Sequence, residues 1–369
     1  MKRAIASLSS FCFLVLSILL APLASSEAQS VLLAENVSEF TVLNNTEVLY
    51  CDSDANFFIV NTQSPDEARP WDPGWDPTLR GWEEATTLVH LCASPDGQWV
   101  CFARFVAIPD DMLLQADESV PWPLAVVVAP VYGTTAWLAA LAWEVGGGPG
   151  FDFTMDSMNL YGQPFVSSET CLEDFLAYFR RDPDRERVEA FSIINLQSGE
   201  RTGSGLCFND GYVACPYSDL VAADDMCIGV IADMSTEEIV FGDPVDYYYG
   251  FEVEKWVLED AILVRKDGEQ CLLYADGTVV ENPGENDISV YCWMPGGEYV
   301  FSTDGGRTVL YGNIDWDSFS FSEALIMSEL RFRLSIWDKT LPMTDGSGIV
   351  FYSYELEGLV FYPVPVSGD

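Results

Sequence analysis

The residues with the clearest chemical potential are tryptophans that stand beside aspartates. Residues 70–82 read PWDPGWDPTLRGW and contain Trp71, Trp75 and Trp82, and Trp122 lies in a second long segment. An indole ring can stack on a sugar or anchor a protein interface, and a neighbouring carboxylate can bind polar groups. We therefore predict that these four tryptophans contribute to a binding surface. The alternative is that they pack between elements of the fold.

Catalytic motifs are much weaker, and the sequence predicts no catalytic residue. A Ser-His-Asp triad needs a histidine base, and the chain has a single histidine, His90, within the apolar stretch LVHLCAS. We interpret His90 as a core residue. A glycosidase needs only two carboxylates, and 58 acidic residues make any choice of pair arbitrary. A non-catalytic binding protein is the main interpretation, and a glycan-acting hydrolase with paired Asp or Glu is the alternative.

No cofactor is predicted, and calcium is the one ion that the acidic runs could bind through carboxylate and carbonyl oxygens. The candidate runs are Asp52-Ser53-Asp54, Asp110-Asp111 and Asp224-Asp225. None has the spacing of an EF-hand loop, so we interpret them as solvated turns.

The charge of the chain limits its partners. Lys and Arg total 17 against 58 Asp and Glu, which gives a formal net charge of −41. Such a field repels the phosphates of nucleic acids and of anionic lipids. Because 49% of the residues are hydrophobic, the acidity coats a folded body and does not indicate disorder. A protein or a glycan remains as partner, and the oligomeric state is left open.

The N-terminus has the features of a secretory signal peptide. Lys2 and Arg3 precede the apolar residues 11–20, which are too few to cross a bilayer as a helix. We expect cleavage after Ala28, export to the periplasm, the cell surface or the medium, and no membrane insertion of the remaining chain. Residues 29–369 are then one domain.

Cysteines offer two candidate disulfides in an oxidising compartment. Ten cysteines are present, and loss of Cys12 with the signal peptide leaves an odd number. Cys92 and Cys101 flank one short turn, and Cys207 and Cys215 flank what we interpret as another. Each pair is predicted to close across a hairpin.

A turn followed by an apolar strand recurs seven times along the chain. These copies start at residues 42, 94, 171, 207, 257, 294 and 343. Asn, Asp and Gly in the turns tolerate the left-handed backbone of tight hairpins. A further apolar strand follows each copy, at residues 57–61, 124–130, 190–196, 227–233, 271–277, 308–314 and 358–364.

The spacing of these copies predicts an all-β chain folded as a single β-propeller. Repeats of this length are typical of propeller blades, here about seven blades of three to four antiparallel strands. The widest gap between copies is assigned to a flexible, glycine-rich insertion at about 144–164. Six or eight blades, a pair of β-sandwiches or a β-solenoid are the alternatives.

Two segments resemble known propeller motifs. Residues 94–100 (SPDGQWV) resemble the repeat of TolB-like propellers, and residues 175–200 are similar to it, whereas the other copies replace the Pro-Asp pair. Residues 302–309 (STDGGRTV) are similar to the Asp-box of sialidases, with Val309 in place of tryptophan. Both motifs are turns. The resemblance implies the fold and no particular reaction, because such repeats occur in scaffold proteins and in peptidase propellers.

Overall fold

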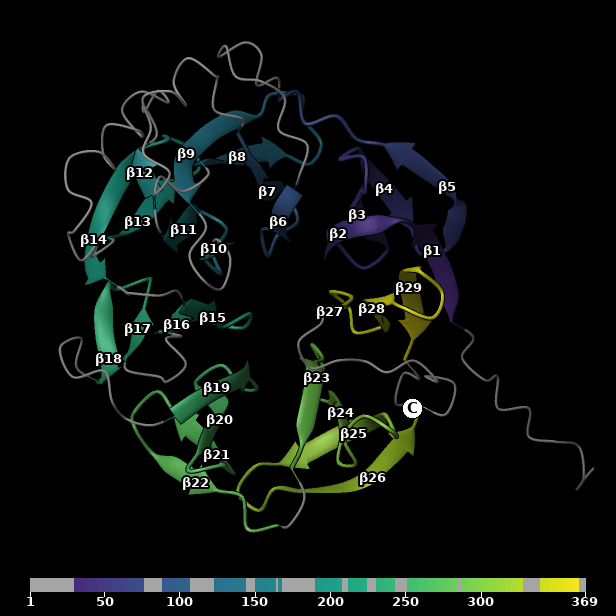
Figure 1. The fold of residues 1–369 in the computed structure, drawn as a ribbon, viewed down its shortest axis with the longest axis vertical. Coiled ribbons are helices and arrows are strands. Elements are labelled where there is room, and N and C mark those ends of the chain that lie inside the picture. Colours follow the sequence, from purple (N-terminus) through teal and green to yellow (C-terminus); the bar gives the residue numbers. More distant parts are fainter. Residues whose placement is uncertain are drawn as a thin grey trace, which may run out of the picture.

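The chain forms a ring of seven antiparallel β-sheets, seen down its axis in Figure 1. The computed structural model describes residues 30–75, 88–106, 123–143, 150–163, 165–167, 190–207, 212–223, 230–242, 251–284, 287–327 and 339–364. The described elements are all strands, which confirms the predicted all-β propeller with seven blades. Among these residues, no helix of the length and apolarity needed to cross a bilayer is present.

Blades 1 to 3 contain four or five strands each. Blade 1 consists of β2 (Val37–Val42), β3 (Glu47–Asp52), β4 (Phe57–Asn61) and β5 (Ser64–Pro70). Blade 2 consists of β6 (Leu88–Ala93), β7 (Trp99–Phe105), β8 (Pro123–Pro130), β9 (Trp137–Trp143) and the added strand β12 (Phe165–Ser167). Blade 3 consists of β10 (Gly150–Phe153), β11 (Asn159–Gln163), β13 (Ala190–Asn195) and β14 (Arg201–Cys207).

Blades 4 to 6 have four strands each. Blade 4 consists of β15 (Tyr212–Ala214), β16 (Leu220–Ala223), β17 (Val230–Asp233) and β18 (Glu238–Gly242). Blade 5 consists of β19 (Phe251–Trp256), β20 (Ala261–Lys266), β21 (Glu269–Tyr274) and β22 (Val279–Glu281). Blade 6 consists of β23 (Ser289–Trp293), β24 (Tyr299–Ser302), β25 (Leu310–Asp315) and β26 (Ser320–Ile326).

Blade 7 closes the ring by joining the two ends of the chain. It consists of β27 (Thr340–Pro342), β28 (Gly348–Ser353), β29 (Gly358–Pro363) and β1 (Val31–Glu35). β1 pairs antiparallel with β29, for example Val31 with Phe361, and Figure 1 shows the first and last strands side by side. The N-terminal strand therefore supplies the outer edge of the last blade, and its backbone hydrogen bonds hold the ring shut.

The core lies between blades, with one apolar cluster at each of the seven junctions. β20 shows how the sequence produces this packing. Ile262 and Val264 point toward blade 4, whereas Ala261 and Leu263 point toward blade 6. Because alternate side chains of a strand face opposite sides of its sheet, a blade that is covered on both sides needs a continuous apolar run.

The turns between the first and second strands of blades 2 and 3 share one hydrogen-bond pattern. In blade 2, Ser94 Oγ lies 2.6 Å from Asp96 Oδ1 and accepts the Trp99 backbone N–H at 2.9 Å. In blade 3, Thr154 Oγ1 makes the same pair with Asp156 at 2.6 Å, and it accepts the N–H of Asn159 at 3.1 Å. The repeat is thus a hydroxyl residue with an aspartate two positions later.

This shared turn corrects the predicted insertion at about 144–164. Residues 150–163 within that segment form β10 and β11, the two inner strands of blade 3. The copy starting at residue 171 lies outside the described residues, and the copy starting at residue 207 runs from blade 3 into blade 4. The turn at 154–159 lacks proline and glycine, so it does not match the Ser-Pro-Asp-Gly form of the repeat.

The strand ends define two rims of the ring. We call the turn rim the side that carries the turns at 43–46, 94–98, 154–158 and their equivalents in blades 4 to 7. We call the groove rim the opposite side, which carries the turn at 52–56 and the starts of β2 and β4. Both candidate binding features described next lie on the groove rim.

Candidate functional site

An open groove of about 540 Å³ separates blade 1 from blade 2 on the groove rim. We call it the Trp75 groove, and its lining includes Asp54, Asn56, Phe58, Trp71, Trp75 and Arg104. The side chains of Asp54 and Asn56 are exposed, and Phe58 and Trp75 are half-buried. The groove therefore offers aromatic surface beside carboxylate and amide groups, which is the composition expected of a ligand site.

The turn at 52–56 forms one wall of the Trp75 groove and is held by its own hydrogen bonds. Asp52 Oδ1 accepts the backbone N–H groups of Asp54 at 2.9 Å and Asn56 at 2.8 Å. Ala55 has φ +65°, a conformation that is unfavourable for a residue with a Cβ. The acidic run predicted as a solvated turn is therefore a turn in which the Asp52 carboxylate is occupied by backbone donors.

Arg104 of β7 forms the floor of the groove and was not anticipated from the sequence. Its guanidinium donates to the carbonyl oxygen of Ala55 at 2.6 Å and lies 4.8 Å from the ring centroid of Phe57. These contacts link blade 2 to the strained turn of blade 1. The one available signal was an arginine inside an apolar strand, CFARF, where a charged side chain needs a specific partner.

The structure separates the two described tryptophans of the predicted surface. Trp71 is only 7% exposed, packs edge-on against Phe57, and donates its Nε1–H to the carbonyl of Val131 at 2.9 Å. Trp71 is therefore mainly a packing residue between blades 1 and 2. Trp75 remains half-buried at the groove. Trp82 and Trp122 lie outside the described residues.

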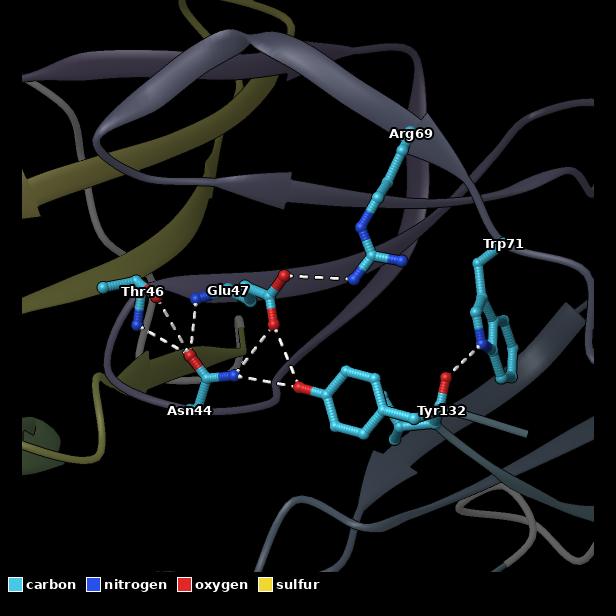
Figure 2. Close-up of polar contacts among 7 residues, drawn as sticks. Asn44, Thr46, Glu47, Arg69, Trp71 and Tyr132 are labelled. Atoms are coloured by element: carbon cyan, nitrogen blue, oxygen red, sulfur yellow. Dashed lines mark hydrogen bonds and ion pairs between the residues drawn. The ribbon is translucent and has the colours of Figure 1, made fainter.

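A polar network near Trp71 joins side chains of blades 1 and 2 on the turn rim (Figure 2). Glu47 accepts from Arg69 at 3.0 Å and from the Tyr132 hydroxyl at 3.0 Å. Asn44 adds a hydrogen bond to Glu47 at 3.0 Å. Although partial burial opposes ionisation, these donors leave the pKa of Glu47 below its usual range. The network joins blade 1 to blade 2, so its side chains are engaged with one another.

A second open groove, of about 400 Å³, separates blade 1 from blade 7 on the groove rim. We call it the Tyr354 groove, and it is lined by Ser38, Glu39, Lys339, Tyr352 and Tyr354, among others. Tyr354 is 69% exposed, and its ring contacts that of Tyr352 at 5.3 Å. This groove again combines aromatic rings with charged side chains.

Lys339 anchors the Tyr354 groove to three blades. It precedes β27 of blade 7, and its Nζ donates to the carbonyl of Leu91 in blade 2 at 2.7 Å. It also lies 3.3 Å from the Glu39 carboxylate and 5.6 Å from the Phe40 ring, both in blade 1. The cation is therefore fixed in place by contacts with neighbouring inner strands.

His90 lacks the environment of a catalytic base. Its ring packs against Phe151 with centroids 4.4 Å apart, and its Nε2 has no hydrogen-bond partner among the described residues. Burial, with a smaller effect of the Lys339 ammonium, lowers the pKa of His90 to about 3. The predicted core role fits this packing, but one ring nitrogen is left unsatisfied.

The two cysteine pairs predicted to form disulfides differ in where their members lie. Cys92 and Cys101 are directly opposite in the β6–β7 pair, and both are free thiols in this structure. Burial, with the neighbouring Cys101, raises the pKa of the Cys92 thiol. Cys207 ends β14 in blade 3, whereas Cys215 follows β15 in blade 4. The predicted hairpin between them is wrong because residues 207–215 cross from one blade to the next.

Metal binding has no support in the part of the chain that the structure describes. No group of three or more His, Cys, Asp or Glu side chains is arranged there to hold an ion. The runs at residues 110–111 and 224–225 lie outside that part.

Comparisons with known proteins establish the fold alone. No family model and no curated protein matches the sequence, so the TolB-like and Asp-box motifs remain resemblances. An oligogalacturonate lyase from Vibrio parahaemolyticus aligns over 94% of this chain and 96% of its own, with TM-score 0.55 and 10% identity. The Cps50 (Swd1) β-propeller domain of Myceliophteria thermophila aligns over 91% and 100%, with TM-score 0.52 and 8% identity.

A prolyl endopeptidase structure is also similar, with TM-score 0.51 and 11% identity. The alignment covers 91% of this chain but 51% of the peptidase chain. A lyase, a peptidase and a propeller domain thus share this architecture, and fold does not specify function.

Proposed function

We propose that this chain is an exported, non-catalytic binding module that holds a protein or carbohydrate partner in the Trp75 groove. The observation that carries the proposal is the groove lining, in which half-buried aromatic rings lie beside the exposed Asp54 and Asn56. Stacking on the rings would provide affinity, and the polar groups would orient the partner.

The groove is preformed, which favours binding. Hydrogen bonds to Asp52 hold one wall, and the Arg104–Ala55 bond holds the floor. A site that is already ordered loses little conformational entropy when the partner binds.

The test is to compare the mature protein with its Trp75→Ala variant on a glycan array and in cross-linking with a secreted-protein fraction. We expect Trp75→Ala to remove binding to whichever partner is found. The matched control is Phe321→Ala, which truncates an exposed aromatic residue of blade 6, a blade that borders neither groove, and should leave binding unchanged. Unaltered binding by a folded Trp75→Ala variant would contradict the proposal.

A further inference from the structure

The turn at 52–56 lies between the two grooves and forms one wall of the Trp75 groove. It borders that groove through Asp54, Ala55 and Asn56. On its other side, Ser38 of the Tyr354 groove donates its hydroxyl to the carbonyls of Cys51 at 3.1 Å and Asp52 at 3.0 Å. A ligand lying over this single turn would therefore reach both grooves.

The wall is rigid from both sides. The backbone N–H of Ser53 donates to the carbonyl of Asn36 at 2.9 Å, next to the Tyr354 groove. On the opposite side, the carbonyl of Ala55 accepts from Arg104 at 2.6 Å. The relative position of the two grooves is thus set by hydrogen bonds within blade 1 and from blade 2, so a ligand would find them at a constant separation.

The two grooves also have the same chemical layout. Each has one cation above a phenylalanine ring, Arg104 above Phe57 and Lys339 above Phe40. Each cation donates to a backbone carbonyl of another blade, and each groove has an accessible aromatic side chain, Trp75 or Tyr354. Neither groove is purely apolar, since Asp54, Asn56 and Glu39 supply further polar groups.

Both grooves contain charges of both signs, so neither a polyanion nor a polycation is matched along the whole site. A polyanion would meet the field of a chain with net charge −41. A polycation would be attracted at long range and by Asp54 and Asp72 of the Trp75 groove, but Arg104 and Lys339 place a fixed positive charge in each groove. A neutral ligand with many hydroxyl groups avoids both penalties, because hydroxyls can donate to Asp54 and Glu39 and accept from Arg104 and Lys339.

We propose that the Trp75 and Tyr354 grooves form one extended site for a neutral oligosaccharide that lies across the turn at 52–56. This inference rests on the proposed binding function and adds the ligand class and the second half of the site. Sugar rings stack on Trp75 at one end and on Tyr354 at the other. The affinity therefore rises once the oligosaccharide is long enough to contact Trp75 and Tyr354 at the same time.

The experiment uses the mature protein and four ladders of neutral sugars, the cello-, xylo-, manno- and N-acetylated chito-oligosaccharides, each from the disaccharide to the octasaccharide. Binding is followed by calorimetry at low and high salt. For at least one ladder we expect the longest members to bind roughly ten-fold or more tightly than the shortest, because they engage both grooves. The affinity should change little with salt, since no net charge is matched.

Two variants separate the grooves. Trp75→Ala should weaken binding of every length, whereas Tyr354→Ala should remove only the gain that comes with length. Phe321→Ala is the control, because this exposed aromatic residue belongs to blade 6, which borders neither groove. Thermal unfolding of each variant confirms that it is folded.

Each other outcome overturns a distinct statement. If Tyr354→Ala leaves the long sugars unaffected while Trp75→Ala weakens them, the Trp75 groove binds alone and the extended site is wrong. If none of the ladders binds, the neutral oligosaccharide site is wrong, and salt-dependent binding of a basic peptide through Trp75 would then identify a cationic protein segment as the ligand. If Trp75→Ala alters no binding at all, the proposed function itself fails.

Discussion

Two turns closed by an aspartate, one on each rim, have similar local hydrogen bonds but different surroundings. At residues 94–99 on the turn rim, Asp96 closes the turn, and its backbone N–H donates to Ser157 of the next blade at 3.1 Å. At residues 52–56 on the groove rim, Asp52 closes the turn, and grooves lie on both sides. The turn rim uses its turns to join blades, whereas the groove rim leaves space between them.

The turn rim continues this contact from blade to blade. Met155 of blade 3 donates its N–H to Asp219 of blade 4 at 2.8 Å, and Ser218 donates to the Glu259 carbonyl of blade 5 at 2.6 Å. Polar groups at these turns therefore form hydrogen bonds between adjacent blades. A partner on that rim would have to break bonds between blades, so binding is better supported on the groove rim.

The largest expected effect concerns Trp71 and Trp75, which are close in sequence but differ in burial. We expect Trp71→Ala to lower the free energy of unfolding by about 3–5 kcal/mol, because it leaves a cavity between blades 1 and 2. Trp75→Ala should cost less than about 2 kcal/mol, since its ring is only partly covered. Urea unfolding of both variants measures this, and equal losses would show that the two tryptophans have the same role.

The next effect tests the contact between turns of blades 1 and 2. Gly97 has φ +66°, and a Cβ there would lie 2.1 Å from the carbonyl oxygen of Leu43. Gly97→Ala should therefore cost about 3 kcal/mol, from the left-handed backbone and from the clash. Gly199→Ala is the matched control, because it has φ +69° and nothing within 4 Å. A cost no larger at Gly97 than at Gly199 in thermal unfolding would argue against close packing of these turns.

A third effect concerns the pKa values of two carboxyl groups, Asp152 in a buried position and Asp304 in a turn. Hydrogen bonds from the Thr308 hydroxyl and backbone lower the pKa of Asp304 to about 2, whereas burial raises the pKa of Asp152, on the innermost strand of blade 3, to about 6. Because the pKa of Asp152 is higher in the folded chain than in the unfolded chain, ionisation of this carboxyl group destabilises the folded state. Stability is thus lost as the pH rises from about 4 to about 6, by up to roughly 3 kcal/mol.

Asp152→Asn should remove that loss. We expect the variant to be more stable than the parent near neutral pH and equal to it near pH 3, where the carboxyl group of Asp152 is mostly protonated in both the folded and the unfolded chain. Urea midpoints at the two pH values measure the difference. A stability change that is the same at both would show that the ionisation of Asp152 is not its cause.

The smallest effect tests whether the turns of blades 2 and 3 are equivalent. Ser94→Ala and Thr154→Ala each leave a backbone N–H without its acceptor, and each should cost about 1 kcal/mol. Thr154→Ser keeps the hydroxyl and should be close to neutral. If only Ser94→Ala is destabilising in urea unfolding, residues 154–159 are not a copy of the same turn.

The seven third strands of the blades were predictable from sequence because each is an apolar run flanked by turn residues. β4, β8, β13, β21, β25 and β29 lie within or overlap the predicted segments, and β17 occupies the described part of its own. The first-to-second turns were harder to recognise. The copy starting at residue 207 spans the step between blades 3 and 4. The turn of blade 3 at 154–158 was not recognised, because the shared feature of blades 2 and 3 is a hydroxyl–aspartate pair and does not require proline or glycine.

The candidate site was only partly predictable. Tryptophan beside aspartate drew attention to residues 70–75, but burial divided Trp71 from Trp75. Arg104 and Lys339 carry no local motif, and their importance comes from partners 49 and 248 residues away.

The sequence alone determined the class of fold, since short continuous apolar runs and the Asn, Asp and Gly turns between them act over a few residues. Tertiary structure decided how the ring closes and where the grooves lie. β1 pairs with β29 although the two strands lie at opposite ends of the chain. Many short apolar strands could fill that edge position, so the local sequence does not specify which strand closes the ring. The grooves arise from the packing of blade 1 against blades 7 and 2, which no local pattern specifies.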